Sequence, residues 1–208
     1  MAMNEITRRG LIYGTATAAA CVLLAGVERI ARSAFAENDE PEGDSGPVTI
    51  VKFADDGTPL GTVTTPRIRK SKAEWKKQLT PLQYDVTRRA ATEFAFSGSL
   101  YDQHAPGLYR CIDCGNALFD SRTKFDSGTG WPSFWEPIAR ENVREKKDFS
   151  LGVLRTEVRC TLCGAHMGHV FTDGPEPTGL RYCMNSAALR FVPRISATLD
   201  SAAASQKK

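Results

Sequence analysis

Short apolar runs, aromatic residues and turns follow one another over residues 108–192, and this pattern predicts antiparallel strands. The expected strands cover residues 108–110, 117–120, 149–159, 170–171 and 187–192. All of them are short, and turn residues separate them. We therefore expect a mainly β domain in this part of the chain.

Two short helices are predicted ahead of the strands. Each opens with a capping box, in which a hydroxyl side chain and a side chain three residues later bind each other's backbone N–H groups. The two pairs are Ser71 with Glu74 and Thr80 with Gln83. Proline follows the second cap, at the first helical position. In the second helix we expect Leu82, Val86 and Ala90 to share one side.

Residues 37–70 precede the helices and predict a linker with a possible hairpin. Residues 37–47 are acidic, rich in Pro and Gly, and without apolar side chains to bury. Residues 48–53 are β-branched, a turn at Asp56 and Gly57 follows, and residues 61–65 supply a second arm. The pattern does not indicate what this hairpin packs against.

The two ends of the chain differ from the domain that we expect over residues 71–194. Residues 1–36 resemble a twin-arginine export signal, because Arg8 and Arg9 precede an apolar stretch that ends in small residues. We expect cleavage after Ala36 and a periplasmic or otherwise exported domain. The alternative is an uncleaved membrane anchor that faces outside, since the apolar stretch is just long enough to span a bilayer. The tail, residues 195–208, is small and polar and is expected to be disordered.

Length and charge narrow the class of protein. A chain of 208 residues accommodates one ordinary domain with extensions. The formal net charge is +3, and two of these charges belong to residues 1–36, which contain four arginines and two glutamates. The rest of the chain is nearly neutral, so we expect no nucleic-acid partner.

Four cysteines form two matched pairs, each an Arg, a CxxC and a Gly: Cys111, Cys114, Cys160 and Cys163. Two such pairs can offer four thiolates to one tetrahedral Zn²⁺, and a site with four thiolates is structural because no coordination position stays open. Two disulfides or a redox CxxC are alternatives, although neither pair lies in a strand-to-helix unit. A site of Cys160, Cys163, His166 and His169 would leave the first pair unused.

Cys183 is the thiol left over in the domain. It stands between Arg181 and Asn185 and follows His166 and His169, which are the residue types of nucleophilic thiol chemistry. Arg181 is a candidate for binding substrate and for favouring the thiolate. The alternatives are an inert buried cysteine, a thiol protease, and a zinc-ribbon binding module without chemistry.

An aromatic motif adds a candidate binding surface. Trp131, Phe134 and Trp135 lie in the segment SGTGWPSFW, beside two glycines and a proline. Trp131 and Phe134 are candidates for holding a small apolar group. The alternative is that these rings belong to the core.

Several motifs, in the same order, resemble those of peptide methionine-R-sulfoxide reductases of the B type. They are the two CxxCG pairs, GTGWPSF, GAHMGHVF, and DGPEPTGLRYCMN with the SAAL that follows. The resemblance covers about residues 71–193. It implies two antiparallel β-sheets in an open-barrel-like arrangement, short helices on the amino-terminal side, and a structural zinc away from the active site.

The resemblance also implies roles. Cys183 would attack the sulfoxide sulfur of oxidised methionine in proteins or peptides, release methionine and become a sulfenic acid. Trp131 would receive the terminal methyl group. His166, His169 and Asn185 would orient and protonate the sulfoxide oxygen. Such a protein repairs oxidised proteins in the defence against oxidative stress.

One position departs from this family pattern. Thr129 stands where many members carry a resolving cysteine, in the motif GCGWPSF. The resemblance then implies that a thioredoxin-like or other thiol reductant acts directly on the sulfenic acid.

Overall fold

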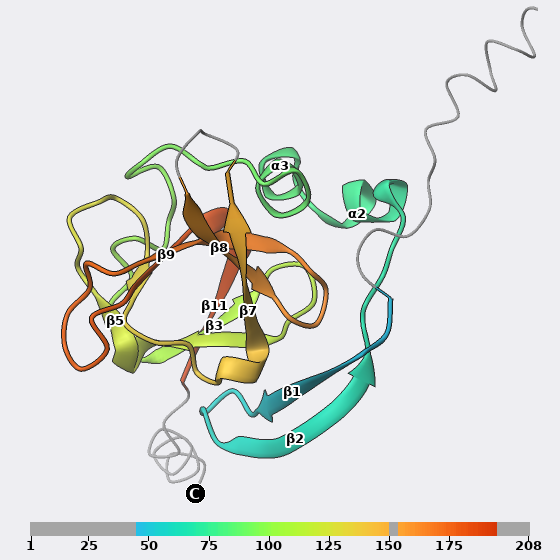
Figure 1. Ribbon diagram of the computed structural model, residues 1–208, viewed down its shortest axis with the longest axis horizontal. Helices are drawn as coiled ribbons and strands as arrows, with labels where there is room; N and C mark the ends of the chain where they lie inside the picture. The colour runs from blue at the N-terminus through green and yellow to red at the C-terminus, as the bar shows by residue number, and fades with distance from the viewer. Residues whose placement is uncertain (1–44, 150–153, 195–208) are drawn as a thin grey trace, which may run out of the picture. The chain divides into compact units, whose positions relative to one another are not determined.

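The structure is a computed structural model that describes residues 45–149 and 154–194. In these ranges the strands form a two-stranded hairpin, a three-stranded sheet and a six-stranded sheet (Figure 1). The prediction of a mainly β domain with short helices ahead of the strands is confirmed, while the barrel-like arrangement stays a prediction. The expected export signal and tail lie outside the described residues. No helix in the described ranges is long and apolar enough to cross a membrane.

The predicted hairpin is present and is longer than expected. Strand β1 (Pro47–Phe53) pairs antiparallel with β2 (Pro59–Pro66). Gly57 adopts a φ of +88° in the turn, which an L side chain rarely adopts. The Asp56 carboxylate accepts a 2.8 Å hydrogen bond from the Thr58 backbone N–H and closes the turn.

Asn142 supplies the partner of the hairpin that the sequence pattern did not indicate. Its side chain is fully buried at the end of a 3-10 turn, Arg140–Asn142. Its Oδ1 accepts from the Val51 N–H at 2.8 Å, and its Nδ2 donates to the Val51 carbonyl at 2.8 Å and to the Ala117 carbonyl at 2.7 Å. One side chain therefore joins the backbone of β1 to that of the domain.

Helices α2 (Lys72–Gln78) and α3 (Pro81–Arg89) begin at the predicted caps, and both capping boxes are formed. The predicted apolar side of α3 is right only for Val86, because Leu82 is 53 % exposed, Ala90 is exposed, and the helix buries Tyr84 and Thr87 beside Val86. A threonine can be buried here since its hydroxyl donates to the Gln83 carbonyl at 2.8 Å. The buried side is therefore not the most apolar one by residue type.

The three-stranded sheet has the order β11 (Leu189–Pro193), β3 (Gly107–Cys111) and β4 (Ala117–Asp120). These strands confirm three of the five predicted ones. The six-stranded sheet has the order β5-β6-β10-β9-β8-β7. Its strands are β5 (Lys124–Phe125), β6 (Ser133–Phe134), β10 (Arg181–Met184), β9 (His166–Phe171), β8 (Arg155–Cys160) and β7 (Val143–Asp148).

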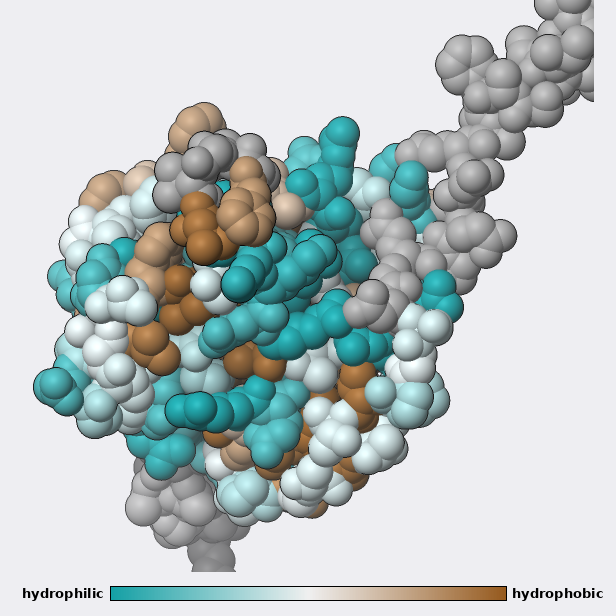
Figure 2. Space-filling model, in the orientation of Figure 1, coloured by the Kyte–Doolittle hydropathy of each residue, from teal (hydrophilic) through white to brown (hydrophobic). Residues whose placement is uncertain are grey.

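In the six-stranded sheet the predictions were incomplete. Strands β5, β6, β7 and β10 were missed, β9 extends further than residues 170–171, and β8 begins later than residue 149. Strand β7 has the sequence VREKKD and lies at the edge of the sheet, so it carries no apolar pattern to detect. Hydrophilic side chains cover this part of the surface (Figure 2).

The register of the six-stranded sheet separates a core face from an open face. Tyr182 and Phe134 pair across β10 and β6, and both are buried in the core. Cys183 pairs with Ser133 on one side and with His169 on the other. Since side chains alternate between the two faces of a strand, these three lie on the face opposite to Phe134.

Replacing Asn142 by Ala is expected to release the hairpin from the domain. The change leaves the backbone groups of Val51 and Ala117 without their partner, which costs about 1–3 kcal/mol of the free energy of unfolding. Amide hydrogen exchange should then speed up across residues 47–66. Thr49→Ala, which removes only the exposed hydroxyl pair with Thr64, is the matched control. Unchanged protection of β1 in the Asn142 variant would contradict this role.

Candidate functional site

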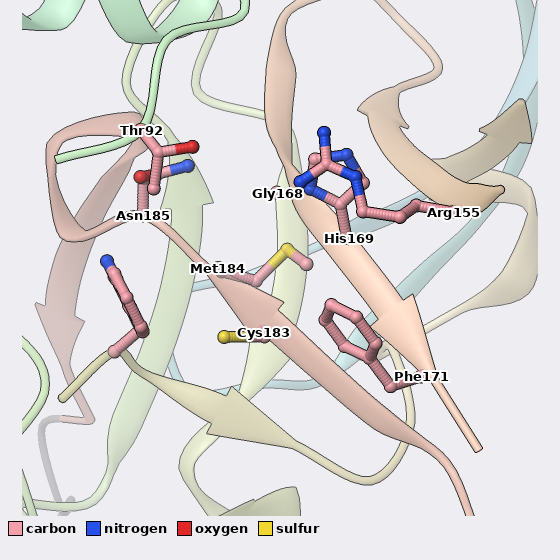
Figure 3. A pocket seen from close by; sticks show the side chains of 9 residues that line it. Thr92, Arg155, Gly168, His169, Phe171, Cys183, Met184 and Asn185 are labelled. Atoms are coloured by element: carbon pink, nitrogen blue, oxygen red, sulfur yellow. The ribbon is translucent and has the colours of Figure 1, made fainter. Parts of the chain in front are cut away.

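A cavity of about 130 Å³ opens over the face of β10 that carries Cys183. Figure 3 shows Cys183 between two groups of side chains, with Thr92 and Asn185 on one side and His169 and Arg155 on the other. The complete lining is Thr92, Trp131, Arg155, Gly168, His169, Phe171, Cys183, Met184 and Asn185. Four predicted site residues, Cys183, Trp131, His169 and Asn185, therefore meet in one place.

The Cys183 thiol is half-buried and faces hydroxyl groups. The Thr129 hydroxyl lies 4.0 Å from its Sγ, and the Ser127 hydroxyl bridges Thr129 at 2.8 Å and Ser133 at 2.7 Å. Burial raises the pKa of the Cys183 thiol, while the hydroxyls of Thr129 and Ser133 and the guanidinium of Arg181 act in the opposite direction. The thiol form therefore predominates at neutral pH, and thiolate has to form as substrate binds.

His169 is the histidine that reaches the cavity. Its Nε2 lies 2.9 Å from the Asp148 carboxylate, which also accepts a 2.6 Å hydrogen bond from Arg155. Because the carboxylate accepts, Nε2 carries a proton. Burial lowers the pKa of His169 and outweighs the opposing effect of Asp148, so the ring is mainly neutral at pH 7.

His166 does not line this cavity. It is buried beside His169, with the two ring centroids 5.4 Å apart, and its Nδ1 lies 2.7 Å from the Glu157 carboxylate. Burial alone would raise the pKa of Glu157, but hydrogen bonds from His166 and Arg159 lower it to about 2. Glu157 is therefore a carboxylate that holds His166 in place. The structure puts His166 behind the pocket rather than in it.

Asn185 has its amide occupied by backbone groups. Its Oδ1 accepts from the Glu93 N–H at 3.0 Å, and its Nδ2 donates to the Met167 carbonyl at 3.1 Å. The partner that orients His169 is Asp148, so the arrangement of a thiol protease, in which Asn orients the histidine, is not present among the described residues.

Glu93 is a site residue that the sequence did not indicate. Its carboxylate accepts from the Ser186 and Ala187 N–H groups at 2.6 and 2.8 Å and so caps the 3-10 turn after Asn185. Its carbonyl accepts from Trp131 Nε1 at 3.2 Å. The Glu93 segment therefore holds the indole and the end of β10 together. Asp148 and Arg155 were missed as well, because β7 carries no apolar pattern and its pairing with β8, which brings the two residues together, was not predicted.

Two predicted substrate-binding residues do not line the cavity. Phe134 is fully buried and stacks on Phe119, with ring centroids 4.4 Å apart, because it points to the core face of β6. Arg181 makes two hydrogen bonds to the Asp173 carboxylate, at 2.9 and 2.8 Å, and its guanidinium lies 4.5 Å from the centroid of Phe171. Phe171 is the ring that reaches the cavity, and Arg181 supports it from outside.

The four paired cysteines form one cluster whose sulfur atoms lie within 4.8 Å of one another. The Sγ atoms of Cys111 and Cys163 are 3.7 Å apart, and those of Cys114 and Cys160 are 3.6 Å apart. A tetrahedral zinc with Zn–S distances near 2.3 Å requires sulfurs about 3.8 Å apart. The geometry therefore fits a metal ion. The five cysteines in the described ranges form no disulfide, so the disulfide alternative is not supported.

The two CxxC loops have the same backbone design. Gly115 and Gly164 have φ of +77° and +73°, and each donates its N–H to the carbonyl of the first cysteine of its pair, at 2.8 and 2.9 Å. Arg88 of α3 joins the loops, because it donates to the Asp113 carboxylate at 3.1 Å and to the Cys163 carbonyl at 3.2 Å. The helix thus fixes both halves of the cluster.

Comparison with known proteins is consistent with this geometry. The family model described as "SelR domain" matches residues 79–193. A protein of Methylibium petroleiphilum named peptide methionine sulfoxide reductase MsrB is 55 % identical over 128 residues, which are 62 % of this chain and 93 % of that protein. Proteins with the same name from Pseudomonas aeruginosa (strain UCBPP-PA14) and Bradyrhizobium diazoefficiens are 55 % and 53 % identical. They cover 62 % and 63 % of this chain, and 98 % and 94 % of their own lengths are matched.

We expect purified, reduced protein to contain zinc, and Cys114→Ser to lose it. Three thiolates hold the ion poorly, and the cluster then leaves buried sulfurs without a partner. Metal analysis and thermal unfolding check this, with Cys183→Ser as the control that should keep both metal content and unfolding temperature. A well-folded, fully reduced sample without metal would contradict the assignment.

Proposed function

We propose, because the chain belongs to the peptide methionine sulfoxide reductase B family, that Cys183 carries out the reduction of methionine-R-sulfoxide in proteins or peptides. The family makes the chain an oxidoreductase of protein repair. The observation that carries the residue assignment is the meeting of Cys183, Trp131 and His169 in one cavity.

The cavity can sort the three substituents of the sulfoxide sulfur. Trp131 and Phe171 offer apolar surface for the terminal methyl group. Arg155 offers N–H donors on another wall, beside the imidazole of His169, where negative charge develops on the sulfoxide oxygen. Since methyl and oxygen then occupy different walls, only one configuration at sulfur presents its sulfur atom to Cys183. This supports selectivity for one configuration, and the family indicates that it is the R form.

The first half of the reaction transfers one oxygen atom. The Cys183 sulfur attacks the sulfoxide sulfur and forms a sulfur–sulfur bond. The sulfur–oxygen bond of the substrate and this new bond then break as the protonated oxygen moves to Cys183, which leaves a sulfenic acid and releases methionine. Methionine sulfoxide is reduced by two electrons to methionine, and Cys183 is oxidised by two. The proton of the sulfenic acid comes from the Cys183 thiol, and the donors on the wall beside the oxygen stabilise this oxygen while it is transferred.

The second half requires a thiol from outside the domain. A reductant thiol condenses with the sulfenic acid, which forms a mixed disulfide and releases water, and a second thiol then frees Cys183. Thr129 lies beside Cys183, where a resolving cysteine would have to be, and the remaining cysteines of the described ranges belong to the cluster. A thioredoxin-like protein or another thiol is the proposed reductant.

The cysteine cluster has a structural role in this proposal. Zinc bound by four thiolates would hold the CxxC loops and would leave no position for substrate. Cys111, Cys114, Cys160 and Cys163 are the proposed ligands, as their sulfur geometry fits a tetrahedral ion. None of these residues lines the cavity of Cys183.

We also propose that the enzyme is exported. The arginine pair and the apolar stretch of residues 1–36 support a twin-arginine signal. A membrane-anchored enzyme that faces outside is the alternative, and the mass of the mature protein distinguishes the two.

Cys183→Ser is expected to abolish turnover of a methionine-R-sulfoxide peptide while zinc content and fold stay intact. A serine hydroxyl is a poor nucleophile at neutral pH and cannot form a sulfenic acid. Trp131→Ala should mainly raise the KM, because the indole contributes apolar surface rather than bond formation. Normal turnover in the Cys183 variant would remove Cys183 from the mechanism.

Thr129→Cys is expected to introduce a resolving cysteine. The Thr129 hydroxyl is 4.0 Å from Sγ of Cys183, and a disulfide requires Cα atoms within about 7 Å with compatible directions. After one turnover without reductant, dimedone labelling of Cys183 should fall and a 129–183 disulfide should appear by peptide mass. Thr129→Ser is the matched control and should keep the labelling. Absence of the disulfide would show that the two positions do not approach in the oxidised enzyme.

A further inference from the structure

A second cavity of about 310 Å³ adjoins the sulfoxide pocket, and its lining is unusually basic. Two residues, Arg155 and His169, line both cavities. Five cationic side chains and two carboxylates line the second one. The cations are Arg89, Lys146, Lys147, Arg155 and Arg159, and the carboxylates are Asp148 and Glu157.

The carboxylates of this cavity are already bound to other groups. Asp148 accepts from Arg155 at 2.6 Å, and Glu157 lies 2.7 Å from His166 Nδ1. The lysines of β7 add positive charge beyond these pairs, and both are exposed. Lys146 stands directly opposite Glu157 in the sheet, so it lies on the face that carries His169 and Cys183.

His166 provides an independent sign of a missing polar partner. It is only 2 % exposed, it lines the second cavity, and its Nε2 has no hydrogen-bond partner among the described residues. A buried ring nitrogen of this kind usually has a partner. Since Nδ1 donates to Glu157, a ligand carboxylate in the cavity would supply one by accepting from Nε2–H of the doubly protonated ring.

We propose that the second cavity binds a carboxylate of the substrate itself, from an Asp or Glu close to the oxidised methionine in the polypeptide. The inference rests on the proposed function, since the neighbours of a peptide-bound methionine sulfoxide must lie on the surface around its pocket. Consecutive Cα atoms are about 3.8 Å apart, so a side chain one or two positions away reaches a cavity that shares two residues with the pocket. The hydrophilic surface over β7 and β8 in Figure 2 is the side from which such a chain would approach. The enzyme would therefore favour oxidised methionines in acidic segments.

The test compares methionine-R-sulfoxide peptides that differ only in one neighbouring residue, Glu, Gln or Lys, placed in turn at each of the two positions on either side. Dithiothreitol, which is uncharged, serves as the reductant, so that charge on the reductant does not contribute. We expect a lower KM for Glu than for Gln, and for Gln than for Lys, at one or more positions. Lys146 and Lys147 should each contribute about a two- to fivefold difference in KM between the Glu and Gln peptides.

Variants of the cavity residues distinguish binding of the carboxylate in the cavity from a general electrostatic attraction between the enzyme and an acidic peptide. Lys146→Gln with Lys147→Gln should reduce the preference for Glu, and Lys146→Glu with Lys147→Glu should reverse it in favour of Lys. Lys77→Gln on α2 removes one positive charge outside the cavity, as Lys146→Gln alone does within it, and should leave the preference intact. Equal effects of Lys77→Gln would overturn the site, as would equal KM values for all wild-type peptides. If the Gln peptide is not reduced at all, the proposed function fails instead.

Discussion

The pairing of β10 between β6 and β9 is the constraint on which the site depends. It puts Ser133, Cys183 and His169 opposite one another in three adjacent strands. A slip of one residue in either pairing would turn Cys183 into the core and bring Tyr182 to the cavity. The thiol therefore meets its imidazole and hydroxyl neighbours because of backbone hydrogen bonds, before any contact among the side chains contributes.

The cysteine cluster secures this pairing from a distance. Cys111 ends β3 of the three-stranded sheet, and Cys160 ends β8 of the six-stranded sheet. A metal ion held by both CxxC loops would join the two sheets at one point, and Arg88 joins the same loops to α3. In the proposed function, stability and chemistry would thus be divided between the four clustered cysteines, which could hold a metal ion, and Cys183, which lines the cavity.

The sequence predicted best what depends on near neighbours in the chain. The CxxC loops and the helix caps each need a few adjacent residues, and their spacing alone indicated them. The strands of the open face were harder, because β7 is polar at a sheet edge and β10 is only four residues long. The face on which a short strand places its side chains also depends on register. Phe134 on β6 belongs to the core for this reason, whereas Trp131, which precedes the strand, reaches the cavity.

Residues that the sequence missed reach the site through contacts that are distant along the chain. Glu93 accepts hydrogen bonds from the turn after Asn185, and Asp148 is hydrogen-bonded to His169.

The central claim is that the substrate oxygen ends on Cys183, and mass spectrometry after a single turnover tests it most directly. The mature enzyme is incubated with one equivalent of a methionine-R-sulfoxide peptide and no reductant. The account predicts that the peptide loses one oxygen atom while the Cys183 peptide of the enzyme gains one that dimedone can trap. A reduced peptide together with an unmodified Cys183, or a disulfide that involves a cysteine of the metal cluster, would contradict it.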